Sequence, residues 1–276
     1  MRSTEQIESK FKDTLLGLID SINDPRLVGS SVIEWASPIL SFGNPMKSSV
    51  ATLGLNPSNL EFVDFSGNEL EGLSRRFHTL NSLELDGWKS LGVSAAELIL
   101  EKCYKYFDNN PYDAWFKKLD FLISGAGFSY YFPFYNACHL DLVPYATEQK
   151  WSSLNSQEKL TLLEVSGNSL GLILRESNID TLILNGQSVV DAIQIVSDIT
   201  FMKEEMLGWN LPRKSIRDVS GYSYSGVVEK IGEISLGKAV KILGFNHNIQ
   251  SSFGVTNIVQ SEIRKWIKMK LDNGEI

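Results

Sequence analysis

The stretch VATLGLNPSNLEF, residues 50–62, contains an apolar run that stops abruptly in a polar turn. The run from Val50 to Leu55 has the composition of a buried strand, and Asn56-Pro57-Ser58 ends it because asparagine and proline favour turns. Two interpretations are open. The segment is a plain turn, or it is a loop at the carboxyl end of a sheet strand, where open α/β folds bind their ligands.

Helix-like and strand-like segments alternate along the rest of the chain. This alternation predicts an α/β fold, a single three-layer domain with a central, mainly parallel sheet flanked by helices. We expect one domain over residues 1–276, with 1–45 as an N-terminal helical extension and 57–130 as an insertion-like segment. Helices are expected over 3–22, 73–85, 94–107, 154–177, 187–199 and 255–271, and strands over 50–55, 130–140, 179–186, 222–231 and 237–246.

The composition limits the possible functions. The chain has 276 residues and a net charge of −7, which argues against a general nucleic-acid binder but permits a local basic face. No apolar run is long enough for a membrane span, and the polar N-terminus lacks the apolar core of a signal peptide. The two cysteines, Cys103 and Cys138, are too few for a disulfide framework or a four-cysteine metal site. We expect a cytoplasmic monomer with reduced thiols and without metal or cofactor.

The predicted strands end in similar polar segments, GLNPS, YNACHLD, LNGQS and GFNHNIQSS, each of which contains asparagine. The carboxyl ends of parallel strands converge on one crevice. An asparagine side chain offers one carbonyl acceptor and two amide hydrogens, so it can recognise the edge of a nucleobase or position a water molecule.

In order and spacing, these segments resemble the uracil-DNA glycosylase superfamily. GLNPS is similar to the first motif, in the Gly-x-Asn-Pro form of the mismatch-specific and single-strand-selective branches, and FYNACHL is similar to the strand whose asparagine recognises the pyrimidine. LNGQSVVDAI resembles the next strand and helix, and GFNHNIQSSFG the second motif. The resemblance spans residues 48–56 and 132–270. The second motif lacks its usual proline, so Asn246 or His247 leads it, and the cluster-bearing branches do not fit the cysteine content.

The resemblance implies a monofunctional DNA N-glycosylase that flips a pyrimidine out of DNA and leaves an abasic site. Asn56 would hold the water and the sugar, and His247 would donate to the departing base. A carboxylate of Glu61, Asp64 or Glu69 is a candidate general base. Candidates for contact with the base are Leu55, Asn136 for its edge, and Phe77 or Phe65 for its face.

The same resemblance implies a DNA-binding surface around the crevice. The motif loops contain no lysine that could form a Schiff base. Gln250 or Ile249 would fill the gap left in the base stack, and His78 and His139 are expected to be structural. The predicted DNA-binding residues are Ser58, Arg75, Arg76, Asn246, Gln250, Ser251 and Ser252.

Three features favour a bulky modified cytosine, such as glucosylated hydroxymethylcytosine in phage DNA, over uracil. These are the long segment 57–130, the proline-free second motif and the aromatic stretch from Tyr130 to Tyr135. Such a substrate would indicate antiviral defence. The alternatives are a uracil or thymine-mismatch repair glycosylase, and a non-catalytic nucleotide or nucleic-acid-binding module on the same fold.

Overall fold

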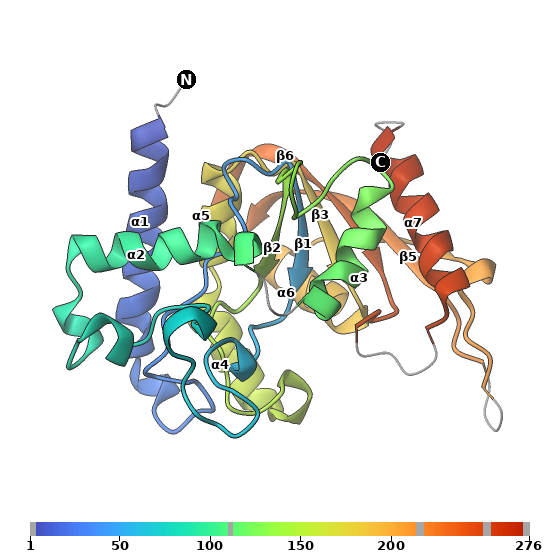
Figure 1. Ribbon diagram of the computed structural model, residues 1–276. Helices are drawn as coiled ribbons and strands as arrows, with labels where there is room; N and C mark the ends of the chain where they lie inside the picture. Colours follow the sequence, from blue (N-terminus) through green and yellow to red (C-terminus); the bar gives the residue numbers. More distant parts are fainter. Residues whose placement is uncertain (1–3, 110–112, 214–217, 251–254, 273–276) are drawn as a thin grey trace.

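A six-stranded sheet forms the centre of the computed structural model, which describes residues 4–109, 113–213, 218–250 and 255–272 (Figure 1). The strand order is β2-β1-β3-β6-β5-β4. Strands β2, β1, β3 and β6 are parallel, whereas β5 and β4 continue the sheet in antiparallel pairs. The strands are β1 Val50–Gly54, β2 Ala137–Asp141, β3 Thr181–Asn185, β4 Met202–Glu205, β5 Tyr222–Ile231 and β6 Ile234–Phe245.

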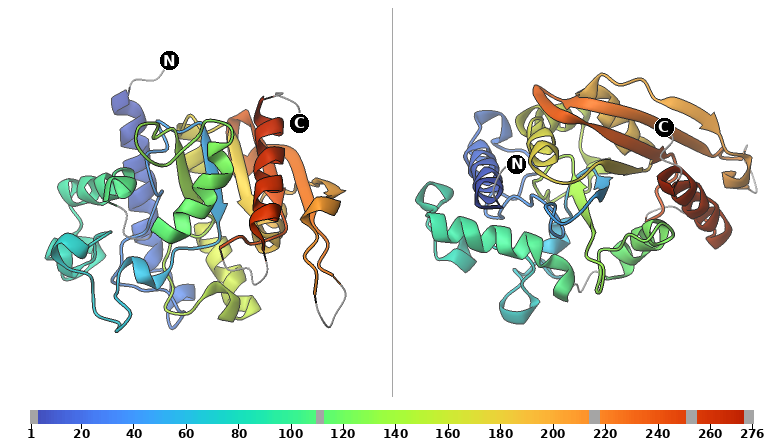
Figure 2. Two further views of the ribbon diagram at one scale, coloured as in Figure 1. Left: turned by 45° about the vertical axis from the view of Figure 1, so that its right-hand side comes forward. Right: turned by 90° about the horizontal axis from the view of Figure 1, so that it is seen from above.

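Helices cover both faces of the sheet, which makes the predicted three-layer α/β architecture. In β3, Leu182 and Leu184 pack into one half of the core and Ile183 into the other, as the alternation of side chains along a strand requires. Helices α3 and α7 lie side by side on one face (Figure 2). The helices are α1 Thr4–Ile22, α2 Val93–Tyr104, α3 Asp113–Ser124, α4 Ser156–Ser166, α5 Ser169–Glu176, α6 Gln187–Ser197 and α7 Asn257–Asp272.

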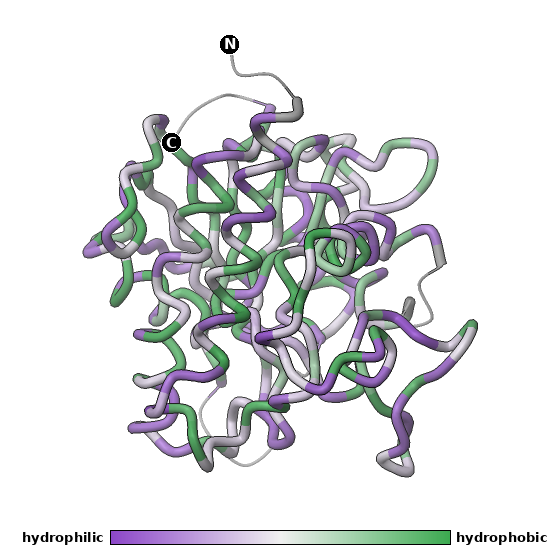
Figure 3. Tube along the Cα trace, turned by 90° about the vertical axis from the view of Figure 1, so that its left-hand side faces the viewer, coloured by the Kyte–Doolittle hydropathy of each residue, from purple (hydrophilic) through white to green (hydrophobic). Residues whose placement is uncertain are grey.

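Helix α1 shows why the N-terminal segment belongs to the body of the protein. Phe11, Leu15 and Leu18 are buried against the core that also contains α5, while the opposite face is polar. Figure 3 shows hydrophobic and hydrophilic residues alternating along the helices on this side of the molecule. No helix in the described part of the chain combines the length and apolar character needed to cross a bilayer.

The segment 57–130 also contributes to the core. Phe62, Phe77, Tyr106 and Phe116 are buried in the half of the core that α3 and α7 cover. Their rings form a network around Phe42, with ring centroids 4.8–5.4 Å from Phe42 for the last three. The segment therefore packs directly onto the sheet.

The strand registers place the carboxyl ends of the parallel strands in one row. Gly54 pairs with Asp141, Leu53 with Leu184, and Asn185 with Phe245. The loops that follow these strands consequently leave the same edge of the sheet, the lower edge in Figure 1.

Most predicted elements agree with the structure, with informative exceptions. The strand over 222–231 has the predicted bounds, and Asn155 caps α4 by accepting a hydrogen bond from the Glu158 amide. The helix predicted over 73–85 is wrong, because this segment forms only two short 3-10 turns, Gly72–Ser74 and Asn81–Leu83. The strand predicted from residue 130 begins only at Ala137. Helix α3 and strand β4 were not predicted.

Candidate functional site

A groove of about 910 Å³ runs along the carboxyl edge of the parallel strands. The loop from Gly54 to Asn59 forms one wall, Asp141 ends β2 beside it, and the segment from Asn185 to Val189 leads from β3 into α6. Asn246, after β6, also lines the groove. All four strand ends that were predicted to converge therefore do so.

Asn56 lines the groove, and its side-chain amide is held in place by the protein. Its Nδ2 donates hydrogen bonds to the Pro57 carbonyl at 3.1 Å, to the Tyr145 carbonyl at 3.4 Å and to Thr147 Oγ1 at 2.9 Å. The Thr147 hydroxyl donates its hydrogen to the Gln149 carbonyl, so in the contact with Asn56 it must be the acceptor. Three acceptors fix the amide orientation, and among the described residues nothing donates to Oδ1. Asn56 can thus offer a positioned acceptor to a water or a hydroxyl.

His139 and Asp141, both on β2, form a buried polar pair in the groove wall. His139 Nε2 lies 3.4 Å from Asp141 Oδ1, and the two side chains are almost fully buried. On the other side of the ring, His139 Nδ1 lies 2.7 Å from Thr52 Oγ1, which lies 2.5 Å from the Tyr130 hydroxyl. His139, expected to be merely structural, is therefore the imidazole that lines the groove.

Aromatic rings surround the imidazole of His139. Phe42, Trp115 and Phe116 all line the groove and have ring centroids 5.3–5.5 Å from that of His139. Gly54 makes room for the pair, because a Cβ at this position would lie 2.3 Å from Asp141 Oδ1 and 3.0 Å from His139 Nε2. The glycine of the GLNPS segment is needed for this close approach. We call this part of the groove, where the polar pair meets the aromatic rings, the recess.

Of the three carboxylates predicted as general base, Glu61 is the one that lines the groove. It lies in the 3-10 turn Asn59–Glu61, is 4% exposed, and accepts hydrogen bonds from the Tyr106 hydroxyl at 3.0 and 3.1 Å. Burial raises the pKa of Glu61 to about 7, against the opposing effect of Arg76, whose Nη1 lies 3.5 Å away. Of the other two candidates, Asp64 closes a local turn through Ser66 and Asn68, and Glu69 bonds Thr79; neither lines the groove.

In the second motif, His247 does not lie in the groove as expected. This side chain is 4% exposed, and its Nε2 bonds the Trp209 carbonyl at 2.7 Å, away from the groove lining. Burial lowers the pKa of His247. Asn246 lines the groove, but its amide ties the loop to β5 by accepting from the Tyr222 amide and donating to the Ser220 carbonyl, both at 2.8 Å. The prediction that His247 faces the crevice is wrong.

The remaining residues of this loop are also occupied or not described. Gln250 accepts a hydrogen bond from Asn185, which in turn accepts from the Ile249 amide at 3.3 Å. Ile249 is buried, which contradicts its proposed insertion into a base stack. Ser251 and Ser252 lie outside the described residues.

Three of the four residues predicted to contact the base lie elsewhere. Asn136 precedes β2, at the opposite end of the strand from Asp141, and its amide bonds the Ser129 amide and the Gly127 carbonyl. Phe77 is buried and stacks on Tyr106, with ring centroids 5.3 Å apart, and Phe65 is 94% exposed. None of the three lines the groove. Leu55 and Ser58 do line it, as expected.

The cations of the groove are not the predicted arginines. Arg76 donates to the Leu60 carbonyl at 2.7 Å and faces Glu61, and it lines with Arg75 a separate cavity of about 230 Å³. Lys150 and Lys159 line the groove instead. Gln187 and Ser188, at the amino end of α6, line it too, in a position where backbone amides favour anions.

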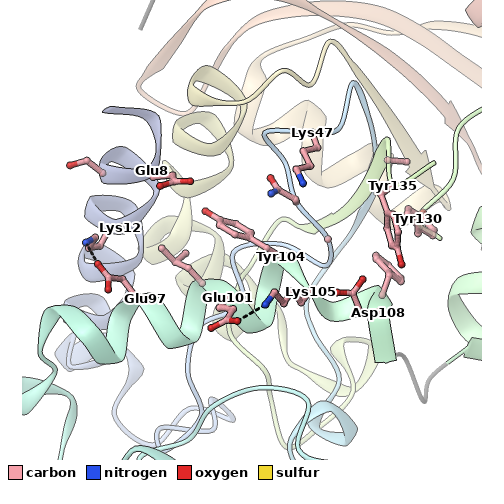
Figure 4. Close-up of a pocket in the computed structure, with 16 residues that line it drawn as sticks. Glu8, Lys12, Lys47, Glu97, Glu101, Tyr104, Lys105, Asp108, Tyr130 and Tyr135 are labelled. Atoms are coloured by element: carbon pink, nitrogen blue, oxygen red, sulfur yellow. Dashed lines mark hydrogen bonds and ion pairs between the residues drawn. The ribbon is translucent and has the colours of Figure 1, made fainter. Parts of the chain in front are cut away.

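A second cavity, of about 640 Å³, lies beside α1 and α2, beyond the amino end of β2 (Figure 4). Its charges largely neutralise one another, since Lys12 pairs with Glu97 at 2.7 Å and Lys105 with Glu101 at 2.6 Å. The aromatic stretch that was taken as a sign of a bulky base contributes Tyr130 and Tyr135 to this cavity and not to the groove. We therefore base the function on the groove.

Of the groove residues missed in the sequence, Asp141 carried a usable signal, whereas Trp115 and Phe116 did not. Asp141 is the polar residue that ends the buried run ACHLD, so the rule that selected Asn56 also selects Asp141. Trp115 and Phe116 lie on α3, far from the motifs in sequence, and no local pattern points to them. In the described part of the chain, no group of three or more His, Cys, Asp or Glu side chains is arranged to hold a metal ion.

No model of a known protein family matches the chain, and a search of curated proteins finds no match. The geometry of the groove is therefore the basis for assigning a function.

Proposed function

We propose that the protein is a monofunctional DNA N-glycosylase that excises a modified or damaged pyrimidine and leaves an abasic site. One observation carries the proposal: Asn56 lines the groove with its amide hydrogens committed to protein acceptors and no described donor to its carbonyl oxygen, and the same groove contains an aromatic recess with a polar end. A glycosylase needs both parts, a place to hold the attacking water and a pocket for the flipped base.

The groove residues supply each step of hydrolysis. Asn56 Oδ1 accepts a hydrogen bond from the water, which Glu61 deprotonates as general base. The water oxygen bonds to C1′ of the sugar as the N-glycosidic bond breaks, and the electron pair of that bond leaves with the base. Positioning of the water and stabilisation of the departing base are the main contributions expected from the protein.

The walls of the groove suit a flipped nucleotide. Trp115, which is half-buried and lines the groove, offers a flat surface against which a base can stack. The groove lining offers hydroxyl and ammonium donors to the flanking phosphates, from Ser58, Ser188, Lys150 and Lys159. This arrangement supports a local DNA-binding face despite the net charge of −7.

A panel of labelled duplex oligonucleotides tests the proposal. Each carries uracil, a thymine mismatch, 5-hydroxymethylcytosine or its glucosylated form, and alkali after incubation cuts the strand at any abasic site. We expect scission with at least one modified base. Binding of all oligonucleotides with cleavage of none would instead favour the non-catalytic module. Borohydride trapping of a protein–DNA adduct would contradict attack by water and point to Lys150 or Lys159.

The Asn56→Ala variant tests the assignment of the water site. We expect excision to fall about 10²–10³-fold, as for the removal of one transition-state-stabilising polar group. Asn136→Ala is the matched control, since it removes an amide with similar structural hydrogen bonds at the opposite end of β2, and it should excise at the wild-type rate. Equal rates for the two folded variants would refute the role of Asn56.

A further inference from the structure

The polar end of the recess contains a carboxylate that lacks a hydrogen-bond donor. Asp141 is 7% exposed and lines the groove, yet no described residue donates a hydrogen bond to it. Its nearest partner, His139 Nε2, is 3.4 Å away, beyond the 2.7–2.9 Å typical of charge-assisted hydrogen bonds. Buried polar groups are nearly always hydrogen-bonded, so this carboxylate is positioned to accept from a ligand.

The proton of His139 is fixed by its neighbours on the other side. Tyr130 is fully buried, and among the described residues its hydroxyl bonds only Thr52. If His139 Nδ1 donated to Thr52, then Thr52 would donate to Tyr130, and the phenol proton would have no acceptor. If instead Tyr130 donates to Thr52 and Thr52 donates to His139 Nδ1, every hydroxyl proton has an acceptor. A neutral His139 therefore carries its proton on Nε2, the atom beside Asp141.

The recess thus presents one donor, His139 Nε2–H, next to one acceptor, the Asp141 carboxylate. Cytosine presents the complementary pair, an N4 amino donor next to the N3 acceptor. Uracil presents the opposite order, the O4 acceptor next to the N3–H donor. A carboxylate is also the side chain that accepts from the cytosine amino group in direct recognition of bases.

We propose that His139 and Asp141 recognise the Watson–Crick edge of a flipped 4-aminopyrimidine, and so select cytosine-type bases over uracil-type bases. This inference rests on the proposed glycosylase function and names its substrate class. Asp141 accepts from the N4 amino group, and His139 Nε2–H donates to N3. Discrimination arises because a uracil-type base would place O4 against the carboxylate and N3–H against Nε2–H, leaving buried groups unpaired.

Two bases that differ only at this edge provide the test. 5-Hydroxymethylcytosine and 5-hydroxymethyluracil are placed in the same duplex opposite an abasic-site analogue, so that pairing strength does not differ. Single-turnover excision is measured for each. We expect the wild type to prefer the cytosine compound by about 10- to 100-fold, the range for one bidentate base contact. In Asp141→Asn, this preference should fall at least about tenfold, because the amide also presents a donor.

Asp191→Asn is the matched control. Asp191 also lines the groove but is exposed and accepts a hydrogen bond from Gln187 Nε2 at 2.7 Å, so its loss should leave the preference unchanged. If Asp141→Asn does not fold, Tyr130→Phe replaces it. That variant removes the Tyr130 hydroxyl, the first donor in the series of hydrogen bonds that orients His139. It should lower the preference for the cytosine compound while both bases are still excised.

The outcomes separate this inference from the proposed function. Equal excision of the two bases by the wild type, or an unchanged preference in the folded Asp141→Asn variant, overturns the recognition of the amino edge and leaves the glycosylase function intact. Excision of no base overturns the function. In that case, the affinities of the wild type for the two free bases are compared. Tighter binding of 5-hydroxymethylcytosine supports the inference, and equal binding overturns it.

Discussion

Glu61 connects the burial of a single side chain to the pH dependence of the proposed reaction. Its pKa is raised to about 7, chiefly by burial, so the carboxylate needed as general base forms only as the pH rises through about 7. We expect the excision rate to increase with pH across this region and then to level off. In Glu61→Gln, the rate should fall by about 10²–10⁴-fold and lose this dependence. Rate–pH profiles of both proteins, measured by single-turnover excision, check the prediction.

The same raised pKa predicts an effect on stability with a definite sign. The folded state binds the Glu61 proton more tightly than the unfolded chain does. The corresponding stabilisation is therefore complete below the unfolded pKa of 4.5 and is lost as the pH rises through about 7. Relative to Glu61→Gln, the wild type should lose about 3 kcal/mol of unfolding free energy between pH 4 and pH 8. Urea titrations across this range measure it, and parallel pH curves for the two proteins would contradict the assignment.

At the scale of single residues, the sequence predicted the strand-end positions and mistook one strand boundary. Asn56, Leu55 and Ser58 reach the groove because a parallel strand delivers its last residues to that edge. Asn136 does not, because β2 begins after it, and an asparagine that starts a strand lies at the opposite edge. His247 was misplaced because its burial under Trp209 depends on a contact 38 residues away in the chain.

The junction of β1 with its loop depends on Gly54, and replacement of this glycine by alanine should destabilise the protein. The added Cβ would lie 2.3 Å from Asp141 Oδ1, and Asp141 is too buried to move freely. We expect Gly54→Ala to lose about 1–3 kcal/mol of unfolding free energy from overpacking and to excise poorly. Thermal or urea unfolding, together with the alkali assay, measures both effects.

Helix α1 provides the contrasting glycine. A Cβ added at Gly17 meets nothing within 4 Å, so Gly17→Ala should gain roughly 0.5–1 kcal/mol from helix propensity and excise normally. A Gly54→Ala variant with the stability and activity of the wild type would show that the close approach of β1 to the His139–Asp141 pair is unimportant.

Elements with a regular period were predictable, and those set by tertiary contacts were not. Strand β5 and helix α6 have the apolar patterns of their types, and their positions agree with the prediction. Residues 73–85 have apolar residues at helical spacing, but Thr79 forms a bridge with Ala36 and Phe77 enters the ring cluster, which holds the chain in short turns. Local propensity yields to such packing.

For the molecule as a whole, the distribution of charge predicts how DNA binding responds to salt. Lys150 and Lys159 line the groove, whereas Arg75 lines a different cavity. If both lysines neutralise phosphates, log affinity should fall with log salt with a slope of about −2 on duplex DNA. Replacement of both lysines by alanine should flatten this slope for all sequences alike, because phosphate contacts carry no base information.

Arg75→Ala is the control for this measurement, and its slope should equal that of the wild type. Fluorescence anisotropy of a labelled duplex at several salt concentrations gives the three slopes. A slope that changes with Arg75 and not with the lysines would place the DNA at the cavity that Arg75 lines, and would support the sequence-based assignment of Arg75 as a DNA-binding residue.

The position of Trp115 gives the groove an optical property. Its half-buried indole lies 5.3 Å from the His139 ring, and Trp151 lines the same groove, whereas Trp88, Trp209 and Trp266 are buried in the core. A base stacked in the recess would exchange solvent for a π surface at Trp115. Binding of a base in the groove should therefore change the tryptophan fluorescence of the protein, so that binding can be measured without an attached dye.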